Sequence, residues 1–276
     1  MWILRRNRKG FLGVGTMMSK LKTAMSSAFV ASAITLTGVS GAVAQTKPTY
    51  SFNVGITSDY VFRGISQSAR SWTGQGGVDM TYGIFYAGLW ASGLDFGKTG
   101  AGKEIARAEV DLYMGIKPVA GPITFDLGVI YYMYPGARDS AAELNYVELK
   151  AGASASPWKD ATIGATVFFS PEYTGETGKV WTLEGSFSQV LPAFGSITPT
   201  FSALIGYQAG DLPKYAIIAN NSKDYVYWNA GVTFGWEKFS LDLRYWDTNI
   251  SNVGGFCTGT ILQCDSTFMG TLKFTY

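Results

Sequence analysis

Apolar side chains stand at every second position through most of this chain from residue 50 onward. The segment 226–236 is typical, with polar or small residues between its apolar ones, which are Val226, Trp228, Ala230, Val232, Phe234 and Trp236. Successive side chains of a β-strand point to opposite faces, so this period indicates strands. We identify twelve such segments, most of them 9–13 residues long, and turn residues separate them.

The length and the charges of these segments indicate where the strands lie. A soluble strand averages about 5–6 residues, whereas a tilted strand needs about 9–11 to cross a bilayer. Charged residues such as Asp111 and Glu148 stand near the centres of the polar faces, where a dry core would make them costly. A wet interior with an apolar outside requires a closed sheet, because lipid offers no partner to an unpaired backbone group. The sequence therefore predicts an all-β protein, a closed antiparallel transmembrane β-barrel of about 12 strands in an up-and-down meander.

The same alternation predicts which side chains face lipid. We expect the first strand to run from residue 50 to Phe62, with Tyr60 and Phe62 outside. We expect Tyr86 and Trp90 to lie outside on a later strand. So large an apolar face would be insoluble in water, which argues against a secreted soluble β-sandwich. Aromatic residues of this face near segment ends are expected to form interfacial girdles, namely Trp72, Tyr82, Trp90, Trp181, Trp228, Trp236 and Tyr245.

The connections between segments alternate in length. With the N-terminus in the periplasm, the periplasmic connections should be the short ones, at 83, 118–122, 156–160, 191–196 and 237–238. The connections at the other end should be longer, and they include 97–103, 135–143, 171–179, 209–223 and 248–266. Twelve strands return the C-terminus to the periplasmic side.

The first 44 residues have the composition of an export signal. They hold six basic residues and no acidic one, followed by an uncharged apolar stretch and by Ala42-Val43-Ala44. A basic start, an apolar middle and an A-x-A site are the parts of a secretory signal peptide. We expect residues 1–44 to be an upstream extension plus signal peptide, and residues 45–276 to form the barrel. Export to an oxidising compartment favours a local disulfide between Cys257 and Cys264, the only two cysteines.

Histidine is absent from all 276 residues, which narrows the possible chemistry. Without imidazole there is no Ser-His-Asp or Cys-His nucleophile system and no His-ligated zinc, and two cysteines cannot form a Cys-only zinc site. After residue 44 the chain holds sixteen basic and twenty acidic residues, so it lacks the excess of basic residues that nucleic-acid binding requires. We therefore predict no enzyme activity, no cofactor, no metal site and no nucleic-acid partner.

Several stretches of the chain resemble a known family. They are Ser58-Asp59-Tyr60-Val61-Phe62-Arg63-Gly64-Ile65-Ser66-Gln67, Glu109-Val110-Asp111-Leu112-Tyr113, Gly128-Val129-Ile130-Tyr131-Tyr132-Met133-Tyr134-Pro135-Gly136 and Asn145-Tyr146-Val147-Glu148-Leu149. They resemble the TorF-type porins, which carry a Gcw_chp domain, and the resemblance implies a β-barrel in the outer membrane of a Gram-negative bacterium. The last segment, ending in Phe274-Thr275-Tyr276, resembles the C-terminal signature read by the barrel insertion machinery. That machinery and outer-membrane lipid are the expected partners.

The strand number suggests what the barrel does. Eight strands enclose a filled interior and sixteen to eighteen leave an aqueous channel, so twelve predict a narrow pore. We predict a porin-like channel for passive diffusion of small hydrophilic solutes or ions. Acidic residues outnumber basic ones on the polar face, which predicts a weak cation preference. The lumen-lining charged candidates are Asp79, Arg107, Glu109, Asp111, Asp126, Glu148, Lys150, Glu184, Asp242, Arg244 and Lys273.

Two alternatives remain open from the sequence. The lumen charges either line the solute path or pair with one another, and Glu148 with Lys150 and Asp242 with Arg244 are the obvious pairs. Inward glycines, Gly206 among them, either leave room for water or accommodate inward tyrosines. The alternative function is a closed barrel with a surface-interaction or structural membrane role and no open pore.

Overall fold

The computed structural model describes residues 47–99, 102–137, 143–211, 213–258 and 263–276. The predicted leader, residues 1–44, lies outside the described residues, so its removal stays a prediction. No helix within the described ranges has the length and apolar character needed to span a membrane.

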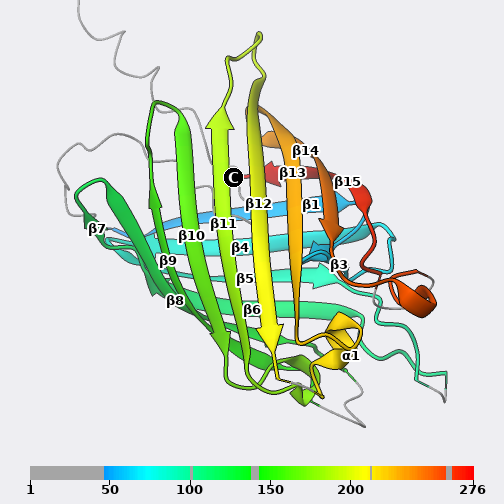
Figure 1. Ribbon diagram of the computed structural model, residues 1–276. Helices are drawn as coiled ribbons and strands as arrows, with labels where there is room; N and C mark the ends of the chain where they lie inside the picture. Colours follow the sequence, from blue (N-terminus) through cyan, green and yellow to red (C-terminus); the bar gives the residue numbers. More distant parts are fainter. Residues whose placement is uncertain (1–46, 100–101, 138–142, 212, 259–262) are drawn as a thin grey trace, which may run out of the picture.

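Twelve long strands form one antiparallel sheet that closes on itself (Figure 1). Neighbours in sequence pair with one another, and the first strand pairs with the last through the register Asn53 to Thr57 against Thr275 to Thr271. This arrangement confirms the predicted up-and-down barrel. The long strands are β1 (Thr49–Thr57), β4 (Thr73–Tyr82), β5 (Phe85–Gly93), β6 (Ala108–Ile116), β8 (Ile123–Met133), β9 (Tyr146–Ala155), β10 (Ala161–Ser170), β11 (Val180–Val190), β12 (Thr198–Gly210), β13 (Asp224–Trp236), β14 (Phe239–Thr248) and β15 (Thr267–Thr275).

The short elements lie in the connections. At one end of the barrel, the turn end, the strands are joined by short turns, one of which contains β7 (Val119–Ala120). At the other end, the loop end, the connections are longer and hold α1 (Ala216–Ala219) and the 3₁₀ turns Thr174–Glu176 and Val253–Gly255. Figure 1 shows α1 at the loop end, toward the bottom of the view. The short and long connections alternate as the sequence predicts.

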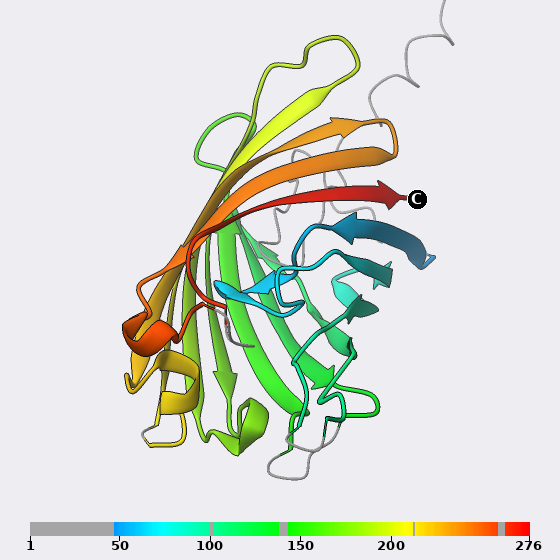
Figure 2. The same ribbon diagram turned by 90° about the vertical axis from the view of Figure 1, so that its right-hand side faces the viewer.

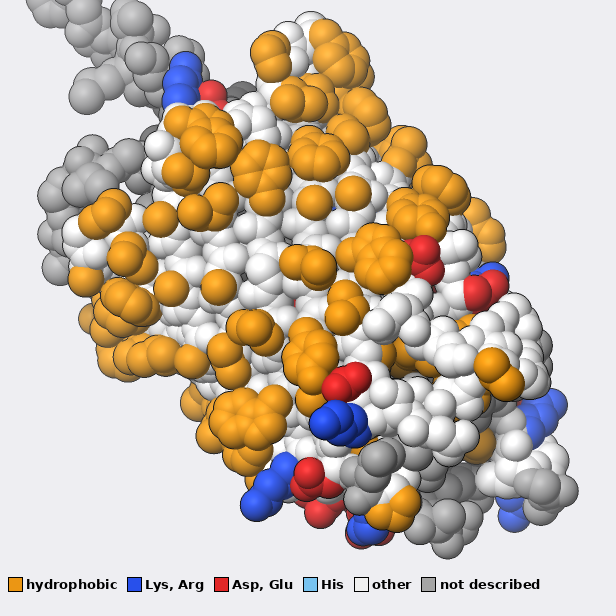
Figure 3. All heavy atoms as spheres, in the orientation of Figure 1, with side chains coloured by type: hydrophobic (Ala, Val, Ile, Leu, Met, Phe, Trp, Pro, Cys, Tyr) orange, Lys and Arg blue, Asp and Glu red, His pale blue; other side chains and the backbone are white. Residues whose placement is uncertain are grey.

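Side chains alternate between the outside and the inside of the barrel. Phe52, Leu183 and Leu272 point outward with 44%, 52% and 45% of their surface exposed, as do many other large apolar residues. Figure 3 shows hydrophobic side chains across the strand face that it presents, with charged side chains gathered toward the loop end. A closed sheet with an apolar outer wall and ionisable residues inside is the architecture of an outer-membrane β-barrel.

The hydrophobic core of this protein lies inside the barrel, near the loop end. It is rich in tyrosines, among them Tyr132, Tyr215, Tyr225 and Tyr227, none of which is more than 2% exposed. Several of them continue the polar-face alternation of β8 and β13. The lumen is therefore packed with aromatic rings in its loop-end half.

Two predicted facings are wrong. The strand β1 ends at Thr57, so Tyr60 and Phe62 do not face lipid, and Tyr60 is 6% exposed. On β5 the residues that point outward are Phe85 and Leu89, whereas Tyr86 and Trp90 point into the barrel: the Tyr86 hydroxyl reaches Asp126, and Trp90 is buried. Small residues fill much of β5, which leaves the two faces of this strand hard to tell apart from the sequence.

Candidate functional site in the barrel lumen

The connection between β1 and β4 forms a small hairpin inside the barrel. Its strands are β2 (Val61–Phe62) and β3 (Ile65–Ser66), and Arg63-Gly64 forms the turn between them. Arg63 and Gly64 both have a positive φ, 49° and 81°, as a two-residue hairpin turn of type I′ requires. Figure 2 shows this light-blue segment within the ring of strands. We call residues 58–72 the lumen hairpin.

The tip of the lumen hairpin reaches the opposite wall. The Arg63 guanidinium donates two hydrogen bonds to the Glu148 carboxylate on β9, at 2.7 and 2.8 Å. It also lies over the Phe168 ring of β10, 4.9 Å from the ring centre. The hydroxyl of Tyr225, on β13, donates to the Arg63 carbonyl oxygen at 3.1 Å. Arg63 is 3% exposed, so this ion pair is fully enclosed.

The base of the lumen hairpin is held as firmly. The Tyr60 hydroxyl donates to Glu109 on β6 at 2.7 Å, and its ring packs edge-on against Trp90 of β5. Asp59 accepts hydrogen bonds from the hydroxyls of Ser66 and Ser68, at 2.6 and 3.0 Å. Burial raises the pKa of the Asp59 carboxyl above its usual value, although these hydrogen bonds oppose the rise.

Carboxylates gather around the lumen hairpin. Glu109, Asp111 and Glu148 are each no more than 2% exposed, and Glu184 accepts a hydrogen bond from the Tyr227 hydroxyl at 2.5 Å. Neither oxygen of the Asp111 carboxylate has a hydrogen-bond partner among the described residues. Within the described part of the chain, Arg63 is the basic side chain that forms an ion pair with this group. The loop-end half of the lumen therefore carries excess negative charge.

The turn-end half of the lumen holds paired charges of both signs. Asp126 accepts hydrogen bonds from the Lys150 ammonium and the Tyr86 hydroxyl, both at 2.7 Å, and the Lys117 ammonium lies 3.9 Å away. The Tyr113 hydroxyl donates to Asp79 at 2.5 Å. The balance of charge in this half is close to neutral.

A second charged cluster lies on β14 in the turn-end half. Arg244 donates to Asp242 from Nε at 3.0 Å and from Nη2 at 2.9 Å. It also donates to Asn229 and Ser202, at 2.6 and 2.9 Å, which ties β14 to β13 and β12. Lys273, on β15, is partly buried in the same half.

The predicted pairings of lumen charges are half right. Asp242 pairs with Arg244 as expected. Glu148 and Lys150 do not pair with each other, because Glu148 binds Arg63 of the lumen hairpin and Lys150 binds Asp126 on the neighbouring strand. Sequence reasoning missed the hairpin as a source of lumen contacts, since it continued the first strand through Tyr60 and Phe62.

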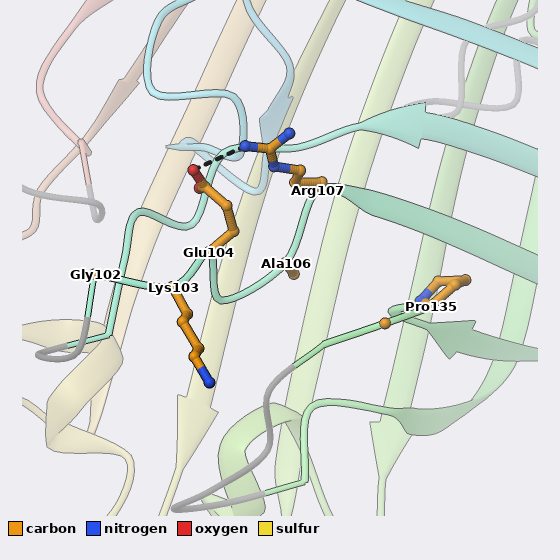
Figure 4. A pocket seen from close by; sticks show the side chains of 7 residues that line it. Gly102, Lys103, Glu104, Ala106, Arg107 and Pro135 are labelled. Atoms are coloured by element: carbon orange, nitrogen blue, oxygen red, sulfur yellow. Dashed lines mark hydrogen bonds and ion pairs between the residues drawn. The ribbon is translucent and has the colours of Figure 1, made fainter.

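Arg107 is the candidate that does not line the wall. It lies before β6 in the loop, its side chain is 74% exposed, and it pairs with Glu104 at 2.9 Å. Figure 4 shows this pair among the residues that line a pocket at the loop end, with Lys103 and Pro135 nearby. The other ten candidates belong to strands β4, β6, β8, β9, β11, β14 and β15, on their inward faces.

The inward glycines accommodate tyrosines. A Cβ atom on Gly206 would collide with the Tyr227 ring, and one on Gly128 would lie 2.5 Å from the Tyr86 hydroxyl oxygen. At these positions the missing side chain makes space for a tyrosine from another strand, β13 for Gly206 and β5 for Gly128, which favours that alternative over room for water.

The described residues contain one disulfide, between Cys257 and Cys264 in the connection from β14 to β15. Both cysteines are 1% exposed. No group of three or more cysteine, aspartate or glutamate side chains in the described ranges is placed to hold a metal ion.

The sequence profile of one family matches residues 41–276, which include every strand of the barrel. The chain belongs to the Gcw_chp family. The family is described as a bacterial protein of unknown function, so membership confirms the resemblance seen in the sequence and assigns no activity. The TorF name stays a prediction for this Gcw_chp protein. A search of the curated proteins found no match.

Solved structures with a similar fold include two porins. The KdgM porin has a TM-score of 0.49 and 8% identity over 82% of this chain and 98% of that chain. The NanC porin has a TM-score of 0.49 and 10% identity over the same shares. LpxR from Salmonella typhimurium has a TM-score of 0.45 and 12% identity over 81% of this chain and 99% of its own. Similarity at this level identifies no solute or activity for the Gcw_chp protein.

Proposed function

We propose that this protein is a narrow outer-membrane channel for the passive passage of small hydrophilic solutes or ions, with a weak preference for cations. The observation that carries the proposal is the placement of ionisable side chains inside a closed barrel whose outer face is apolar. Ionisable side chains on the inner face of a membrane-spanning barrel are typical of a lumen that admits water. Ten of the predicted lumen candidates occupy that face.

The cation preference follows from the loop-end half of the lumen. Glu109, Asp111 and Glu148 meet a single ion-pair partner there, Arg63, among the described residues. Charged groups that line a pore set its ion selectivity. Asp111 adds to this negative charge where water reaches it, because no described residue donates a hydrogen bond to its carboxylate.

Reversal potentials in planar bilayers test both parts of the proposal. Under a KCl gradient the purified protein should conduct, with cations favoured over anions. Asp111→Asn should lower the cation preference and Lys150→Gln should raise it, since the two changes remove opposite charges from the lumen. Both replacements keep the size of the side chain nearly constant. Anion preference in the unmodified protein would refute the charge argument.

A second candidate function is favoured by the lumen hairpin. Residues 58–72 fill the loop-end half of the barrel, and a permanently closed barrel would serve as a surface-interaction or structural membrane protein. Swelling of liposomes in small sugars separates the two candidates. Liposomes that carry the protein should swell if the channel proposal holds, and they should behave like protein-free liposomes if the barrel never opens. Absence of enzyme activity stays a prediction under either function.

A further inference from the structure

The lumen hairpin spans the barrel from wall to wall. Its residues contact Trp90 on β5, Glu109 on β6 and Tyr132 on β8 on one side. On the other side its tip contacts Glu148 on β9 and Tyr225 on β13. With contacts on β5, β6, β8, β9 and β13, the segment crosses the path between the two ends of the barrel.

The barrel wall does not depend on this hairpin. Thr57 at the end of β1 and Thr73 at the start of β4 are register partners, so the ladder between the two strands is complete without residues 58–72. The hairpin itself has two residue pairs, Val61 with Ser66 and Phe62 with Ile65. It can therefore leave the lumen while every wall strand keeps its neighbours.

Side chains hold the tip of the hairpin in place. The Arg63–Glu148 ion pair provides two charge-assisted hydrogen bonds, and Tyr132 donates a third to the same carboxylate at 3.1 Å. Both ions lose their water in the docked state, and this desolvation offsets much of their attraction. When the hairpin moves out, water hydrates both ions again. The net contribution of the ion pair to docking is thus a small balance of large terms.

We propose that the lumen hairpin is the gate of this channel and that the Arg63–Glu148 ion pair is its latch. The proposal rests on the channel function proposed above. In the closed state Arg63 is docked on Glu148 and the path is blocked. In the open state the hairpin leaves the lumen, and Glu148 joins the other carboxylates that line the path.

A deletion tests the gate. Residues 58–72 are replaced by Asn-Gly, because a two-residue turn of that sequence joins register partners such as Thr57 and Thr73. Single-channel recording in KCl should show a steady, larger unit conductance for the deletion variant and mostly closed traces with brief openings for the unmodified protein. Far-UV circular dichroism verifies that the variant keeps its β-structure.

Point substitutions test the latch without removing any backbone. Glu148→Gln and Arg63→Glu should each raise the open probability, by roughly 100-fold, since each leaves a buried charged group without its partner. The double variant R63E/E148R restores an ion pair of reversed polarity and should return the open probability toward the unmodified value. Glu104→Gln is the matched control, because this half-buried loop carboxylate forms ion pairs with Lys98 and Arg107 and not with the hairpin.

The outcomes separate the gate from the channel. A deletion variant that conducts, with latch variants that open no more often than the unmodified protein, overturns the gate and leaves the channel function standing. Equal conductance of the unmodified protein and the deletion variant overturns it as well. A folded deletion variant that never conducts overturns both proposals. Opening by the single substitutions and closure by the double variant support the latch, because a merely structural loss would not be rescued by swapping the charges.

Discussion

A charge placed on the outer face of the barrel should destabilise this protein strongly. Ile205 lies on β12 with 60% of its surface exposed, opposite Gly185 on β11 and Trp228 on β13. All three positions lie away from the strand ends, so Ile205 faces the interior of the bilayer. Arginine at the midplane of a barrel's lipid face costs about 2–4 kcal/mol. Ile205→Arg should therefore raise the equilibrium constant for unfolding by roughly 30- to 1000-fold, at about 1.4 kcal/mol per factor of ten.

Urea unfolding in lipid vesicles, followed by tryptophan fluorescence, measures this free energy. Ser186→Arg is the matched control, because Ser186 is the next residue along β11 from Gly185 and its side chain points to the opposite face, into the lumen. The control should cost much less, since an arginine in the lumen stays near water. If Ile205→Arg cost no more than Ser186→Arg, then the outer face would not meet lipid and the assignment of the two faces would be wrong.

Three further outcomes are expected. Gly206→Ala should lower the free energy of unfolding by about 1–3 kcal/mol in the same assay, because the added Cβ would enter the Tyr227 ring. Gly185→Ala, which faces outward, should be nearly neutral, and equal costs for the two variants would refute the packing argument. Replacing Cys257 and Cys264 by serine should destabilise the β14–β15 connection by about 2 kcal/mol and speed its proteolysis, while the melting temperature of the barrel stays unchanged. An unchanged rate of cleavage in this connection would contradict the expectation. Because burial raises the pKa of the Asp59 carboxyl, docking of the hairpin should strengthen as the pH falls through that raised pKa and level off below the pKa of an exposed aspartate. Hydrogen exchange of the hairpin amides measures this docking. If Asp59→Asn left the exchange unchanged over this pH range, the titration argument would be wrong.

The wall of the barrel could be predicted because each of its side chains has two possible surroundings. A residue on a long strand faces either lipid or lumen, so the period of two is visible wherever apolar and polar side chains alternate. The pattern fails on β5, where Ala87, Gly88 and Ala91 are compatible with either face. The predicted facing of that strand therefore depends on a few aromatic residues. It is wrong because one of them, Trp90, is buried inside the barrel.

The partners of the lumen charges could be predicted only where they are local. Asp242 and Arg244 lie two residues apart on one face, so their pairing follows from the strand itself. Lys150 has the same relation to Glu148, yet Glu148 is bound by Arg63, which comes from a connection far away in the sequence. No local pattern contains that contact, because it depends on where the connection folds after the barrel has closed.

The lumen hairpin could not be predicted from the sequence, because its alternation of apolar and polar residues continues that of β1. Tyr60 and Phe62 follow the apolar positions of the strand in register, so the period alone predicts one strand from residue 50 to Phe62. One feature opposes that interpretation. Gly64 provides the positive φ of a tight turn, beside an Arg63 that adopts it too. The chain therefore turns back at Arg63-Gly64, and at the mouth of a barrel the enclosed place for apolar side chains is the lumen.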